Sequence, residues 1–230
     1  NSGSIAAEHN VSLTGTDIAS TGTLASGVQP DGRTGSSGDL TLSASGKLEM
    51  HGVNAAGGNI TATGRGLDAS GSVTQGNTIT LNAGQGDLST HSAQIVARDT
   101  LRATTAGTLN NKGGLLAADQ LTLTAKRLQN QKGQISQSGT RELTLNHQDG
   151  IDNREGSIAA NATVTVNAAS LDNRQGQIIA ADTGTLTLKT AGLTDNREGE
   201  LAAAGSISVA ADGLDNSGGF ISAEKGRIGL

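Results

Sequence analysis

A short motif that recurs through the second half of the chain constrains the fold most. Its clearest copy, Leu-Asp-Asn-Arg-Gln-Gly-Gln-Ile, spans residues 171–178. Every copy places an Asn three residues before a Gly, and both residues tolerate left-handed backbone dihedrals, so the motif predicts a repeated corner between two short strands. The copies begin at Leu109, Leu128, Ile151, Leu171, Leu193 and Leu214. The predicted corner residues are Asn111, Asn130, Asn153, Asn173, Asn196 and Asn216, with Gly114, Gly133, Gly156, Gly176, Gly199 and Gly219.

Aliphatic residues recur along the chain with a period of 19 to 22 residues after Leu40, in three series that each predict one short strand per period. The first series is Val11, Leu40, Ile60, Ile79, Leu101, Leu121, Leu143, Val164, Leu186, Ile207 and Ile228. The second series is Ile18, Leu48, Leu67, Leu88, Leu109, Leu128, Ile151, Leu171, Leu193 and Leu214. The third series is Leu24, Val53, Val73, Ile95, Leu115, Ile135, Ile158, Ile178, Leu201 and Ile221, with Ile5 before it.

This period is too short for a strand, a helix and a returning strand. The density of Gly, Asn and Thr argues against repeats that contain helices. We therefore predict an all-β fold, a parallel three-strand β-solenoid with about 21 residues per coil and about ten coils. At about 4.8 Å per coil, the rod would be roughly 48 Å long. The anchors are expected to point inward, and such a narrow interior does not need the aromatic residues that the chain largely lacks.

One interval breaks the period, because 29 residues separate Val11 from Leu40. The excess lies in residues 27–38, where Pro30-Asp31-Gly32 indicates a turn. A solenoid accepts insertions at its corners, so this segment is expected to form an exposed loop, either a tolerated linker or a recognition loop. Residues 1–230 are expected to form a single solenoid segment of a longer protein, since Ile5 and Ile228 belong to coils that the chain ends interrupt.

Composition excludes several functions. The net charge is −5 with no basic face, which excludes nucleic acid as an expected partner. No apolar run reaches the roughly 18 residues that span a bilayer. The chain has no Cys, and its four histidines (His9, His51, His91 and His147) are not spaced as metal ligands. We expect no metal and no cofactor.

Acidic residues on successive coils are the only candidates for catalysis. Asp152 and Asp172 are expected to be one coil apart, close to the carboxylate separation of retaining glycosidases. However, Arg154, Arg174 and Arg197 follow the acidic row at a fixed offset, and Asp215 extends it. A catalytic site is normally unique, whereas this feature repeats, so a charge ladder is the better interpretation and no enzyme is expected.

A row of threonines is also expected on one outer face. Regular threonine arrays on flat solenoids can bind ice, but Arg102 interrupts this row, and the β-propensity of threonine explains it better. Its members are Thr41, Thr61, Thr80, Thr122, Thr144, Thr165 and Thr187, followed by Ser208.

The consensus Leu-Asp-Asn-Arg-x-Gly-x-Ile-x-Ala-Ala followed by Leu-Thr-Leu closely resembles the haemagglutinin repeats of filamentous haemagglutinin, which belong to the exoproteins of bacterial two-partner secretion. The resemblance is strongest from Leu109 to Leu230 and stays in register from Ile5 onward. It implies a right-handed parallel β-helix within a long filament that is secreted to the bacterial cell surface, outer membrane-associated, and exported through an outer-membrane transporter. Full-length proteins of this family, referred to below as parent proteins, act as adhesins or as contact-dependent growth-inhibition toxins with a repeat stalk.

The sequence therefore predicts a structural stalk segment that presents an adhesive or toxin-delivery activity. The alternative is that the segment is itself an adhesin, whose surface binds a receptor or glycan on a host or bacterial cell. A carbohydrate-active β-helix enzyme is the third hypothesis.

Overall fold

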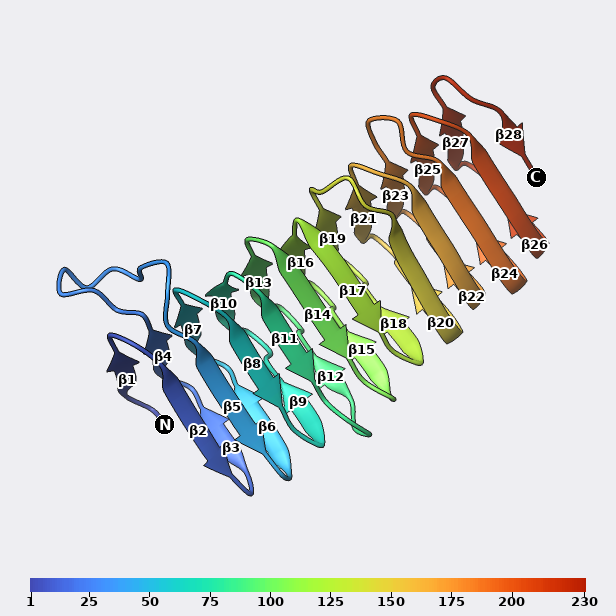
Figure 1. The fold of residues 1–230 in the computed structure, drawn as a ribbon. Coiled ribbons are helices and arrows are strands. Elements are labelled where there is room, and N and C mark those ends of the chain that lie inside the picture. The colour runs from blue at the N-terminus through green and yellow to red at the C-terminus, as the bar shows by residue number, and fades with distance from the viewer.

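A computed structural model describes residues 1–230 as one stack of coils (Figure 1). The chain forms 28 strands and no helix. Every strand pairs in parallel with the equivalent strands of neighbouring coils, about 21 residues away in the sequence. The prediction of an all-β parallel solenoid is confirmed. No segment forms an apolar helix of membrane-spanning length.

The first face of the rod contains the strands that carry the first aliphatic series. Their register matches that series throughout, for example Leu40 with Ile60 and Ile60 with Ile79. The strands are β2 (Val11–Gly15), β5 (Leu40–Ala44), β8 (Ile60–Thr63), β11 (Ile79–Asn82), β14 (Thr100–Thr104), β17 (Gln120–Thr124), β20 (Leu143–Asp152), β22 (Val164–Asp172), β24 (Leu186–Asp195), β26 (Ile207–Asp215) and β28 (Ile228–Gly229).

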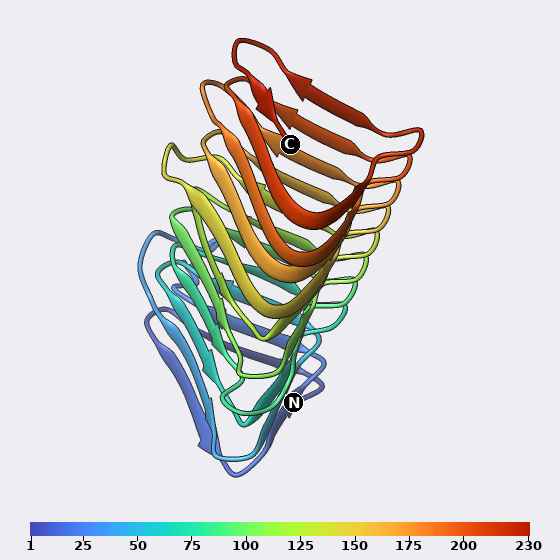
Figure 2. The same cartoon turned by 90° about the vertical axis from the view of Figure 1, so that its right-hand side faces the viewer.

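The second face has separate strands only in the N-terminal part of the rod. These are β3 (Ile18–Ser20), β6 (Lys47–Met50), β9 (Gly66–Asp68), β12 (Leu88–Ser89), β15 (Thr108–Asn110) and β18 (Arg127–Gln129). From β20 onward, one long strand runs through the first corner. Register irregularities fall between His147 and Gly150 in β20 and between Ala168 and Leu171 in β22. Three strands per coil thus become two, and the long bent strands are visible along the rod in Figure 2.

The third face is a separate sheet of eleven strands, one per coil. Figure 1 shows these short strands side by side along the whole rod. They are β1 (Ser4–Ala7), β4 (Thr23–Ser26), β7 (Val53–Ala56), β10 (Val73–Gly76), β13 (Gln94–Ala97), β16 (Leu115–Ala118), β19 (Gln134–Gln137), β21 (Ser157–Ala160), β23 (Gln177–Ala180), β25 (Glu200–Ala203) and β27 (Phe220–Ala223).

A single apolar core runs up the inside of the stack. It contains 45 buried residues, all of them Leu, Ile, Val, Ala or Met. Side chains alternate in and out along each strand, so Leu40 and Leu42 point inward while Thr41 points outward. Burial of each large aliphatic side chain stabilises the fold by about 1.5 to 3 kcal/mol.

Four predicted inward anchors are wrong by one residue. Val53 and Leu193 are 45% and 50% exposed, and the residues that follow them, Asn54 and Thr194, are buried. The same shift places Thr74 inside in place of Val73, and Leu116 inside in place of Leu115. The reason is strand alternation. Pairing of Leu24 with Asn54, and of Leu171 with Thr194, sets which position faces the core, whatever the polarity of its side chain.

Residues 27–38 leave the stack between β4 and β5 and extend away from it at one end of the rod in Figure 1. Their one internal pairing is an antiparallel bridge between Val28 and Thr34. The segment returns to the coil beside its starting point, where the Ser26 hydroxyl donates to the Gly38 carbonyl at 3.0 Å. Its two ends therefore meet at one corner of the second coil.

Candidate functional site

The structure brings the six predicted asparagines and six predicted glycines together in one corner column, between the second and third faces. The first five asparagines are completely buried, and Asn216 is partly buried. Each Asn side chain donates to the carbonyl oxygen of the Gly three residues later, at 3.1 to 3.3 Å. This local bond closes the corner within each coil.

The same amide groups link successive coils. Each Nδ2 also donates to the Oδ1 of the next Asn toward the C-terminus, at 2.6 to 2.7 Å, so five bonds join Asn111 to Asn216. Thr90 begins the column, because its hydroxyl donates to Asn111 Oδ1 at 2.9 Å. Sequence reasoning missed Thr90, although its place two residues after Leu88 matches that of Asn111 after Leu109.

The column needs glycine because coils approach closely there, and not because of a left-handed dihedral at the Asn or the Gly. A Cβ added at Gly176 would lie closer than 3.0 Å to the Asn153 carbonyl oxygen and to Asn173 Oδ1. The left-handed residue is the one before the Gly, with φ of 55° at Gln175 and 56° at Lys132. The sequence-based explanation of the Asn and Gly was therefore wrong in this detail.

The acidic row forms a second ladder outside the Asn column. Arg174 donates twice to Asp172 of its own coil, from Nε at 2.9 Å and from Nη2 at 2.7 Å. Its Nε also lies 3.5 Å from Asp195 Oδ2 in the next coil. Arg154 and Arg197 repeat this arrangement. The ladder therefore runs through Asp152, Arg154, Asp172, Arg174, Asp195, Arg197 and Asp215.

Three carboxylates of this ladder, those of Asp152, Asp195 and Asp215, have a pKa below the ordinary value. The bonds from Arg197 lower the pKa of Asp195 below its ordinary value. Burial opposes ionisation of Asp152, but hydrogen bonds from Arg154 outweigh it and lower the pKa of that carboxyl too. The Ser217 hydroxyl lowers the pKa of Asp215, and the bond to Asp172 raises the pKa of Arg174.

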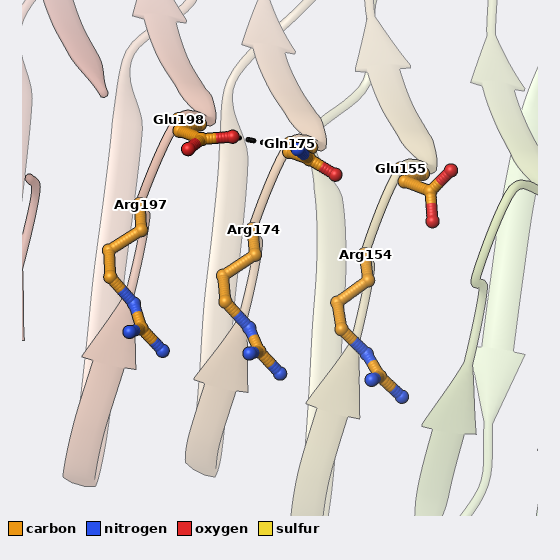
Figure 3. Close-up of a pocket in the computed structure, with 6 residues that line it drawn as sticks. All are labelled: Arg154, Glu155, Arg174, Gln175, Arg197 and Glu198. Atoms are coloured by element: carbon orange, nitrogen blue, oxygen red, sulfur yellow. Dashed lines mark hydrogen bonds between the residues drawn. The ribbon is translucent and has the colours of Figure 1, made fainter. Parts of the chain in front are cut away.

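A shallow surface pocket lies over this ladder. Figure 3 shows its three arginine side chains parallel to one another, with their guanidinium groups on the same side. Gln175 donates to Glu198 across the pocket at 2.7 Å. Asp152 and Asp172, considered above as a glycosidase pair, each accept two bonds from the arginine two residues later. The pocket residues are Arg154, Glu155, Arg174, Gln175, Arg197 and Glu198.

The histidines are dispersed over the rod. His9 is exposed, while His51 and His91 contact backbone carbonyls of the following coils through Nδ1, at 2.9 and 2.8 Å. His147 is 2% exposed, with Nδ1 2.9 Å from the Ala125 carbonyl and Nε2 without a partner. Burial lowers the pKa of His147. No three His, Asp or Glu side chains gather in a way that suits a metal ion.

The threonine row lies on the first face and is interrupted once. Thr41, Thr61 and Thr80 lie in register, and Arg102 takes the next place, as the spacing indicates. The column resumes at Thr122 and ends beside Ser208.

Comparison with known families and proteins agrees with this geometry. The model of the haemagglutinin repeat matches residues 1–52, 140–192 and 183–226, more than half of the chain. The chain belongs to the haemagglutinin repeat family. The resemblance to the repeat region of filamentous haemagglutinin and of two-partner secretion proteins is thereby confirmed.

Two curated relatives are named as a toxin and as a tRNA nuclease. Toxin CdiA of Yersinia pestis is 38% identical over 117 residues, which make up 49% of this chain and 4% of that protein. The tRNA nuclease CdiA-2 of Burkholderia pseudomallei is 38% identical over 108 residues, 46% of this chain and 4% of that protein. No solved structure matches the chain.

Proposed function

We propose that this chain is a stalk segment, which supplies length and stiffness to a long secreted protein of the bacterial cell surface. The observation that carries the proposal is that the polar groups of the candidate site are occupied by one another. The Asn amides bond to Asn amides, and the arginines bond to aspartates, from one coil to the next. Such groups join coils and leave little free for a ligand.

The comparisons supply the context of this proposal. The segments shared with the two relatives are only 4% of each protein. We therefore assign to this chain a contribution to the length of such a protein, and not the activity for which the relatives are named. We propose that the parent is exported through an outer-membrane two-partner secretion transporter, remains outer membrane-associated, and presents an adhesive or toxin-delivery activity. Each coil would contribute about 4.8 Å of length.

One observation favours the alternative of an adhesive surface. Residues 27–38 form the one long excursion from the stack, and Asp31 and Arg33 at its tip have mostly exposed side chains. Loops of this kind carry binding functions more often than coils do. The third hypothesis, a carbohydrate-active enzyme, has less support because Asp152 and Asp172 are both bound to arginines.

The stalk proposal is tested in the parent protein by removing whole coils. Deletion of residues 143–185 joins Glu142 to Leu186 in register, because Leu143, Val164 and Leu186 are aligned. Export and folding should be retained, and the filament should shorten by two coils, roughly 10 Å. A matched variant replaces the same residues with two other coils of the rod, which keeps the length and changes the surface.

The replacement should leave adhesion or toxin delivery unchanged. If it abolished either activity while the protein stayed folded and exported, the segment would be a binding surface. A glycan array and a cell-binding assay with the 230-residue chain give an independent readout, in which the stalk proposal expects no specific binding.

A further inference from the structure

The outer surface of the eleven-stranded sheet carries almost no charge. Its eleven strands have four residues each, 44 in all, and Glu200 is the one charged residue among them. Charged residues make up 16% of the chain, a share that would place about seven in 44 positions. The first face is nearly as poor in charge, with Arg102 and Lys189 in its strands. The strands of the second face are more charged and include Lys47, Asp68 and Arg127.

The outward positions of this sheet form two rows, of which the first mixes polar and apolar residues and the second is mostly alanine. The exposed large side chains Val53, Val96 and Phe220 all belong to it, and Phe220 is 72% exposed. One row is Ser4, Thr23, Val53, Val73, Gln94, Leu115, Gln134, Ser157, Gln177, Glu200 and Phe220. The other is Ala6, Ala25, Ala55, Gln75, Val96, Ala117, Ser136, Ala159, Ile179, Ala202 and Ser222.

Charged residues return at both edges of the sheet. Arg98 and Asp119 directly follow the ends of β13 and β16. At the opposite edge, Lys132 and Glu155 precede β19 and β21, have exposed side chains, and lie 3.4 Å apart as an ion pair. An uncharged centre with a charged rim is the arrangement found in protein interfaces.

We propose that this face, the outer surface of the eleven-stranded sheet, is an interface at which a second copy of the chain docks sheet against sheet. Two sheets pack about 10 Å apart when the side chains between them interdigitate, and small residues such as those of the second row permit this approach. A second copy has the same spacing of about 4.8 Å between strands, so its rows match these rows along the whole length of the rod. A charged partner would find only Glu200 to pair with in the strands of this face.

The size of the face is sufficient for a stable dimer. Eleven strands about 4.8 Å apart and about 13 Å long give a footprint of roughly 620 Å² per copy, or about 1,250 Å² for two copies. Specific interfaces bury about 1,200 to 2,000 Å² in total. Lateral pairing goes beyond the stalk function, which requires only stacking of coils along the axis.

The experiment measures the mass of the 230-residue chain by sedimentation equilibrium between about 1 and 100 μM, a range that covers moderate homodimer affinities. The proposal expects the mass to rise toward twice 22.8 kDa. The double variant Val96→Lys/Ile179→Lys places two charges in the second row and should remain monomeric. The control Thr144→Lys/Thr165→Lys adds the same charges to the first face and should still dimerise.

Circular dichroism of each variant verifies that it is folded. Ser136→Lys changes an exposed residue of the second row without removing an aliphatic side chain, and it provides the same comparison if the double variant unfolds. A monomeric wild-type chain at the highest concentration would overturn the proposal. So would a folded Val96→Lys/Ile179→Lys or Ser136→Lys protein that dimerises as tightly as the control.

Discussion

Replacement of Asn173 by Leu tests whether the corner column stabilises the rod. Asn173 sits in the middle of the column and makes four side-chain bonds. It accepts from Asn153 at 2.7 Å, and it donates to Asn196 at 2.7 Å, to the Gly176 carbonyl at 3.2 Å and to the Glu200 carbonyl at 3.3 Å. Leucine has a similar size and removes all four bonds, while the surrounding residues stay buried.

The expected cost follows from the groups left without partners. Asn196 Oδ1 loses its donor, and Asn153 Nδ2 loses its shortest bond but keeps two longer ones, to the carbonyls of Gly156 and Gln177. A buried polar group without a partner costs about 1 to 3 kcal/mol. The apolar contacts of the leucine side chain offset part of this loss of free energy. We therefore expect a loss in the free energy of unfolding on the order of 1 to 3 kcal/mol.

Urea denaturation followed by circular dichroism measures this loss. Asn167→Leu is the matched control, because the Asn167 amide donates to Asn146 Oδ1 at 2.6 Å on the exposed first face. That bond has the same chemistry but competes with water, so its loss should change the free energy of unfolding by less than about 0.5 kcal/mol. Equal midpoints for Asn173→Leu and the wild type, or equal losses for the two variants, would refute the stabilising role of the column.

Three further predictions follow from the same geometry. Gly176→Ala should lower the free energy of unfolding by about 2 to 4 kcal/mol, because its Cβ would meet the Asn153 carbonyl. At Gly66 the nearest atom to an added Cβ is 3.8 Å away, so Gly66→Ala should lower it far less. Thermal denaturation compares the two variants. The pKa of Asp195 is lowered in the folded state, so its bond to Arg197 contributes stability that is complete above the unfolded pKa of about 3.9. This stability is lost as the pH falls through the pKa of the folded state. The urea midpoint of the wild type should therefore drop below about pH 4 more steeply than that of Asp195→Asn. Deletion of residues 27–38, which joins Ser26 to Asp39, should leave the β circular-dichroism spectrum intact. Loss of that spectrum in the deletion variant would show that the loop belongs to the core.

Much of the fold could be predicted from the sequence because the core is built from one class of residue at a regular interval. The first aliphatic series, from Val11 to Ile228, gives the starting register of each coil without error. At three of the four wrong anchors, a polar residue takes the inward position. Asn54 donates to Thr74 inside the rod at 3.2 Å, and Thr194 bonds to Thr190 at 2.9 Å. A pattern of hydrophobicity contains no signal for such pairs.

The candidate site, like the fold, could be predicted from the sequence only in part. The spacing of Asn and Gly identifies the column residues, because each copy of the motif contains both. The reason for the glycine lies in the preceding coil, some 20 residues away in the sequence, and it requires coordinates. Thr90 caps the column with a hydroxyl and lacks the Asn that defines the motif. A search for the motif therefore starts one coil too late.

The two halves of the rod join their coils differently at this corner. In the C-terminal half, an Asn–Asn bond links each coil to the next, and Arg–Asp pairs add to it from Arg154 onward. In the N-terminal half, the aligned positions include Met50 and Ala69, which are fully buried and pack in the core. A coil cannot fold alone, so the residue in this column must either bond to its neighbour or pack against it. Both solutions join neighbouring coils along the rod axis.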